Sequence, residues 1–172
     1  MTSFFLEKYF LKIKDHANKT CSFEIFPESV KDFLSTKKIR RKLYIVSHES
    51  DCFYVGETNT SIKERMNRGF RSYNTYAKTG IKKAGYGGYK WISPQNNLQR
   101  EMVLHVYTFD DKYDNDREYV EVVEAEFCFL VRQHKKQWPT FQNEIHFNNH
   151  KDSQSAERLA REIFNQIWKN LL

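Results

Sequence analysis

Two β-rich runs lie within residues 42–56, KLYIVSHESDCFYVG, and they decide the fold of this chain. Residues 43–46 and 53–55 are mainly β-branched and aromatic, and such residues favour strands. The polar residues 47–51 between them are typical of a hairpin connection, and Gly56 is expected to end the second strand. We therefore predict an antiparallel hairpin here.

The elements after this hairpin are expected to be a helix, a strand and two helices. A capping box that begins at Ser61 predicts a short helix, which is expected to stop near Gly69. Residues 102–109 are apolar on both faces of a strand, which predicts a central strand. Apolar residues at helical spacing predict two further helices, over residues 120–131 and 159–171.

The segment before the hairpin is predicted to be an ordered extension. Apolar residues within 4–14 recur in an amphipathic helical pattern, and residues 22–26 favour a short strand. Pro27 is then expected to stand at the first position of a helix that runs to about Thr36.

This order of elements predicts an α+β fold, with a small three-stranded antiparallel β-sheet flanked by helices and with N- and C-terminal helical extensions. The expected domains are a helical and basic extension at residues 1–41, a core at residues 42–143, and a loop and helix at residues 144–172.

The formal charge of this 172-residue chain is +6, and it is distributed in blocks. Residues 31–42 carry +5 and residues 63–90 carry +7, whereas residues 110–126 carry −6. Basic blocks that alternate with aromatic residues are typical of a phosphate-binding surface, and a merely solvated surface is the simpler alternative.

Membrane and secretory features are not expected in this chain. No window offers about 18 consecutive apolar residues, and the first residues do not have the pattern of a signal peptide. Cys21, Cys52 and Cys128 form neither a CxxC pair nor an even set, which predicts buried thiols in a reducing cytoplasm.

Several short motifs, in this order, resemble those of the GIY-YIG nuclease superfamily. Residues 42–44 (Lys-Leu-Tyr) stand for the first motif, and residues 54–56 (Tyr-Val-Gly) stand for the second. Arg65 follows on the first helix, Glu126 lies among apolar residues of a later helix, and Asn143 comes after a proline, one residue later than usual.

Two positions depart from the family pattern. Lys42 stands where the family has the glycine of its first motif. Gly69 stands where many members carry a histidine, so any role of that histidine must be absent or moved.

The resemblance implies a metal-dependent endonuclease. Tyr44 would accept the proton of the attacking water, directly or as a relay; a free phenol titrates near ~10, so nearby cations would have to favour the phenolate. Tyr54 would hydrogen-bond that water or a phosphate oxygen, and Arg65 would bind two phosphate oxygens. Glu126 would hold Mg²⁺, with Mn²⁺ as a substitute, and Asn143 would orient Glu126 or bind a backbone phosphate.

The expected partner is double-stranded DNA. One site per chain and two strands to cut imply a homodimer on DNA. Since no separate recognition module is expected, a stand-alone type II restriction enzyme is the expected form. The expected DNA-binding residues are Lys42, Arg68, Arg71, Lys82, Lys83 and Lys90.

Four alternatives stay open at the level of sequence. Glu124 competes with Glu126 for the metal, and Tyr54 competes with Tyr44 for the role of base. The chain could instead be a GIY-YIG-like DNA-binding module without cleavage activity, because it lacks the first glycine of the family. It could also be a nuclease of repair or of a mobile element.

Overall fold

A computed structural model describes residues 6–28, 39–82, 86–93, 100–142 and 145–168 of the chain. Its centre is a five-stranded sheet with the strand order β2-β1-β5-β3-β4, in which all neighbouring strands are antiparallel. The α+β class is as expected, but the prediction of a three-stranded sheet is wrong.

The two additional strands come from the segment before the hairpin. Strand β1 (Leu6–Asp15) replaces the helix expected over residues 4–14, and β2 (Cys21–Pro27) is the strand expected at residues 22–26. In β1, buried and more exposed residues alternate from Leu6 to Ile13, which is the period of a strand with one face in the core. The helix expected from Pro27 to Thr36 lies largely outside the described residues.

The hairpin and the central strand are confirmed. Strand β3 (Lys42–His48) pairs with β4 (Asp51–Thr58) on one side and with β5 (Glu101–Thr108) on the other. Strand β4 does not end at Gly56 as expected but continues to Thr58.

The three helices expected after the hairpin are present, but the first is longer than predicted. Helix α2 (Ile62–Thr79) passes through Gly69 and ends only at Gly80, whose φ of 69° is the left-handed conformation of a helix C-terminus. Helix α3 (Arg117–Lys135) and helix α4 (Ser153–Ile167) follow. The short 3-10 helix η2 (Tyr86–Ile92) was not predicted.

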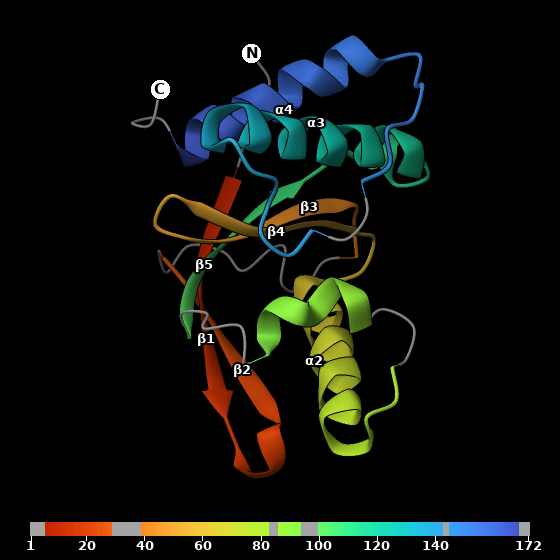
Figure 1. Ribbon diagram of the computed structural model, residues 1–172. Helices are drawn as coiled ribbons and strands as arrows, with labels where there is room; N and C mark the ends of the chain where they lie inside the picture. The colour runs from red at the N-terminus through yellow and green to blue at the C-terminus, as the bar shows by residue number, and fades with distance from the viewer. Residues whose placement is uncertain (1–5, 29–38, 83–85, 94–99, 143–144, 169–172) are drawn as a thin grey trace.

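The sheet divides the molecule into two layers of helices (Figure 1). One core lies between the sheet and α2 with η2, and it contains Tyr44 and Tyr54. The other core lies between the sheet and α3 with α4, and it contains Leu43 and Val55. Within the described part of the chain, no helix is long and apolar enough to cross a membrane.

Candidate active site

Tyr44 and Tyr54 lie next to each other on the α2 face of the hairpin. Their ring centroids are 5.9 Å apart, and the exposed fractions of the two residues are 0% and 8%. Gly56 pairs with Tyr44 across the strands, and a Cβ at position 56 would lie 2.6 Å from the Tyr44 hydroxyl oxygen and 2.8 Å from the Tyr54 ring. The glycine therefore makes room for both rings.

Arg65 joins the tyrosines from the first turns of α2. The Ser61 hydroxyl accepts a hydrogen bond from the backbone N–H of Glu64 at 3.2 Å, which caps the helix as predicted. Further along the same helix, Arg65 Nε donates to the hydroxyl oxygen of Tyr44 at 3.2 Å. The neighbouring Tyr44 oxygen raises the pKa of Arg65, so a fixed positive charge stands beside this phenol.

A third tyrosine, Tyr89 of η2, completes the cluster. Its hydroxyl donates to the backbone carbonyl of Arg65 at 3.0 Å, and the Arg65 guanidinium lies 5.4 Å from the centre of its ring. Burial raises the pKa of Tyr54 and of Tyr89 well above the ordinary value, and the adjacent Tyr44 adds to both shifts. Both residues therefore stay neutral phenols.

Glu124 of α3 approaches the same cluster from the edge of the sheet. Its carboxylate accepts a hydrogen bond from the Gln142 side-chain amide at 3.2 Å, and the amide oxygen of Gln142 accepts from the backbone N–H of Val55 at 3.1 Å. Burial, followed by the negative charge of Glu57, raises the pKa of Glu124 to about 8, and Arg65 opposes the shift. Glu124 also acts electrostatically on Tyr54.

Glu126 faces a different part of the molecule. Burial raises its pKa, and the charged groups that act on it are Glu157 and Arg161, both on α4. Two residues along a helix differ by about 200° in direction, so Glu124 and Glu126 cannot serve the same site. The structure thus places Glu124, and not Glu126, within electrostatic reach of Tyr54 and Arg65.

Asn143 lies outside the described residues, and its neighbour Gln142 contacts Glu124. Gln142 stands one residue closer to Pro139 than Asn143 does. Its amide joins Glu124 to the backbone of β4, so its effect is to orient that carboxylate.

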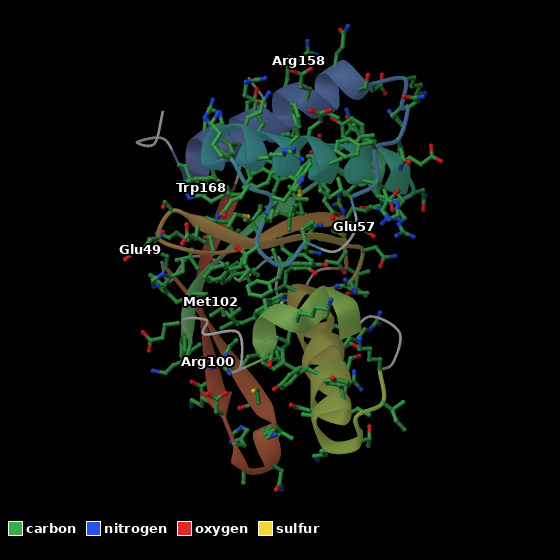
Figure 2. All side chains as sticks on the ribbon, in the orientation of Figure 1. Glu49, Glu57, Arg100, Met102, Arg158 and Trp168 are labelled. Atoms are coloured by element: carbon green, nitrogen blue, oxygen red, sulfur yellow. The ribbon has the colours of Figure 1, made fainter. Side chains whose placement is uncertain are left out.

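Charged residues on one side of Glu124 form a compact network. Glu57, labelled in Figure 2 between α3 and α2, accepts from Arg41 at 2.9 Å and lies 3.3 Å from Arg117. Arg117 also pairs with Glu121 at 2.9 Å. These pairs hold Glu57 close enough to Glu124 to disfavour its ionised form.

The predicted DNA-binding residues fall into two groups. Lys42 is fully buried, and its ammonium donates to the carbonyls of Arg40 at 2.7 Å and Thr60 at 3.1 Å, so it supports the start of α2. The second group is exposed and consists of Arg68, Arg71, Lys82 and Lys90. Arg68 and Arg71 both pair with Glu64. Lys83 lies outside the described residues.

The residues around Glu124 offer few side chains that could bind a metal ion. Among the described residues there is no group of three or more His, Cys, Asp or Glu side chains that could hold one. Mg²⁺ does not need such a group, because it keeps several waters and takes one or two carboxylates. A single carboxylate that is short of solvation and oriented by an amide fits that requirement.

Sequence reasoning missed Tyr89, Gln142 and Glu57. Tyr89 lies in a Gly- and Tyr-rich segment without periodicity, so no pattern indicated that its ring reaches α2. Gln142 was available from the spacing after Pro139, which an asparagine one residue later obscured.

Searches against protein-family models, curated proteins and solved structures found no match to this chain.

Proposed function

We propose that this chain is a Mg²⁺-dependent endonuclease that hydrolyses phosphodiester bonds of double-stranded DNA with a site of the GIY-YIG type. The observation that carries the proposal is the hydrogen bond between Arg65 and Tyr44, together with the approach of Tyr54 and Glu124 to the same point. These residues come from four different elements, β3, β4, α2 and α3.

The residues divide the work of hydrolysis between them. Water attacks phosphorus, the bond to the 3′ oxygen breaks, and the 3′ oxygen takes up a proton from solvent as it leaves. Arg65, which is only partly buried, offers its planar fork to the phosphate oxygens. Glu124 would hold the Mg²⁺, which when bound supplies positive charge to the same oxygens.

The buried position of Tyr44 favours the relay form of its role. Tyr54 is the more accessible phenol, and it interacts with Tyr44 through a side-chain hydrogen bond. A proton of the attacking water passes to the oxygen of Tyr54 while Tyr54 passes its own proton to the oxygen of Tyr44. This relay requires the phenolate form of Tyr44 at the start of the step, and the Arg65 guanidinium donates a hydrogen bond to that oxygen.

The biological setting is proposed on the same basis. Two strands and one site per chain suggest two copies acting on DNA, as in a type II restriction enzyme. The three cysteines are free and buried, which fits the reducing cytoplasm.

The test is incubation of the purified protein with a plasmid of mixed sequence, in Mg²⁺ and in excess chelator, followed by sequencing of the ends. We expect cleavage only with the metal, and ends at discrete sequences. Cleavage that persists in chelator would contradict a metal-dependent site, and ends without sequence preference would contradict the restriction role.

A second candidate is a DNA-binding module without cleavage activity. The complete burial of Tyr44 and of Lys42 favours it, because both residues then have a structural use. Plasmid that is bound tightly and stays intact with Mg²⁺ and with Mn²⁺ would establish this second function.

A further inference from the structure

Beyond the residues used above, we infer that Tyr89 is a positioning residue of this site, which holds Arg65 in place for the phosphate. The inference rests on the proposed function. Tyr89 comes from η2, a segment separate from the hairpin, α2 and α3 that supply the other residues.

Tyr89 contacts Arg65 at two points of that residue. Its hydroxyl donates to the backbone carbonyl of Arg65 at 3.0 Å, and its ring lies against the guanidinium, with 5.4 Å between the guanidinium carbon and the ring centre. A guanidinium over an aromatic face is attracted to it and loses some of its freedom to rotate. The main chain and the charged end of Arg65 are therefore held by the same side chain.

The space that Tyr89 fills is present only because residue 69 is a glycine. A Cβ at position 69 would lie 1.9 Å from the nearest ring carbon of Tyr89, a distance at which the ring must move. Gly69 lies one turn after Arg65 in the interior of α2, where glycine is normally disfavoured. A glycine inside this helix is thus explained by the ring that packs on it.

The ring also connects Arg65 to the rest of the aromatic core. Its centroid is 6.4 Å from that of Tyr54 and 6.0 Å from that of Trp91, and Tyr89 is almost fully buried. Its hydroxyl also interacts with Tyr44. Without it, Arg65 would keep its bond to Tyr44 but would lose its contact with the Tyr89 ring.

The first experiment compares Tyr89→Phe with Tyr73→Phe in single-turnover cleavage at saturating DNA. Tyr73 is the matched control, because it is buried in the same core and its hydroxyl donates to the backbone carbonyl of Lys19 at 3.1 Å. We expect Tyr89→Phe to slow cleavage about tenfold with an unchanged Kd for DNA, as for the loss of one positioning hydrogen bond. We expect Tyr73→Phe to cleave at the parent rate.

A double-mutant cycle then shows whether Tyr89 acts through Arg65. Arg65→Lys removes the fork that Tyr89 positions, so adding Tyr89→Phe to that variant should cause no further loss. If instead the two losses multiply, or if Tyr89→Phe cleaves like the parent, Tyr89 has only a packing role and the inference is overturned.

A second pair of substitutions, at Gly69 and Tyr89, separates the effect on packing from the effect on cleavage. Gly69→Ala should lower both the Tm and the cleavage rate, since the added methyl group displaces the ring. Adding Tyr89→Leu should restore the Tm but not the rate. Parent-like cleavage in the double variant would overturn the role of Tyr89 alone, whereas a parent protein that cleaves no DNA would overturn the proposed function and this inference with it.

Discussion

At the scale of single residues, the defining feature is a carboxyl group that the fold makes difficult to ionise. Glu124 is poorly solvated, lies near Glu57 and accepts a neutral hydrogen bond from Gln142. A divalent cation would relieve this condition, because it replaces the lost solvation and offsets the charge of Glu57.

The pH dependence of cleavage should therefore follow Glu124. Its pKa of about 8 means that the carboxylate, the form that binds a metal, predominates only above that pH. At limiting Mg²⁺ we expect the cleavage rate to rise between pH 6 and pH 9, and saturating Mg²⁺ should move the midpoint to lower pH, because metal and proton compete. A flat profile at limiting Mg²⁺ would exclude Glu124 as the titrating ligand.

The raised pKa of Glu124 also affects the stability of the metal-free protein. Between its ordinary pKa of 4.5 and about 8, the folded protein keeps a proton that the unfolded chain releases. The free energy of unfolding should therefore fall as the pH rises through this window, and Glu124→Gln should lose that part of the dependence. Urea unfolding at pH 5 and pH 8.5 measures the difference between the parent and the variant.

Removing the hydroxyl of Tyr44 should separate catalysis from folding. Tyr44→Phe keeps the ring in the core, so we expect a loss of only about 1 kcal/mol of stability from the hydrogen bond to Arg65. Cleavage should slow by ~10²-fold or more if the phenol takes part in proton transfer. Single-turnover rates and the Tm of Tyr44→Phe and Tyr54→Phe measure both effects, and parent-like rates in both variants would remove the tyrosines from the mechanism.

Residue patterns in the sequence found the tyrosines and the arginine of this site but could not show which glutamate lies near them. Tyr44, Tyr54 and Arg65 were found from their order and from the helix cap before Arg65, and all three lie together. Glu124 and Glu126 could not be distinguished by apolar spacing, because α3 packs against the sheet on one side and against α4 on the other. Both carboxylates therefore have apolar neighbours, and only the packing shows which one reaches the tyrosines.

At the scale of elements, the hairpin depends on a glycine that is needed for close approach. A methyl group at Gly56 would lie within 2.6 Å of the Tyr44 hydroxyl and would push the two tyrosines apart. We expect Gly56→Ala to cost about 1–3 kcal/mol, as other overpacked cores do, and to abolish cleavage. The control is Gly80→Ala, where a Cβ meets no atom within 4 Å but the backbone conformation is strained, so stability should fall and cleavage should remain.

The first strand is the element that sequence reasoning assigned wrongly. Its apolar residues satisfy a helical pattern as well as an alternating one. Its pairing with β2 and β5 decides between the two, and a short stretch of sequence does not reveal that pairing. Phe10, which belongs to the apolar face of the expected helix, is 46% exposed, whereas Leu11 is 0% exposed.

These two neighbours give a direct test of the strand. Leu11→Ala should destabilise the protein by about 2–5 kcal/mol, because the side chain is enclosed in the core. Phe10→Ala should cost much less, since its side chain lies on the open face of the sheet. Urea unfolding of both variants gives the comparison, and equal losses would indicate that Phe10 is also buried, as in the expected helix.

At the scale of the whole molecule, the site lies where the two layers of helices meet. Arg65 comes from the layer on one face of the sheet and Glu124 from the layer on the other, and they approach each other past β4, the edge strand. Thr140 and Phe141 donate backbone hydrogen bonds to Cys52 and Phe53 of β4, and the Gln142 side chain links Val55 of that strand to Glu124. A change in either layer should therefore reach the site.

The most direct test of the central claim compares Glu124→Gln with Glu126→Gln in Mg²⁺-dependent cleavage, with DNA binding and Tm measured beside it. Both substitutions remove one charge from the same helix and keep the shape of the side chain. We expect Glu124→Gln to abolish cleavage while it binds DNA and folds like the parent, and Glu126→Gln to cleave at nearly the parent rate. Loss of cleavage in Glu126→Gln with retained activity in Glu124→Gln would contradict the site described here.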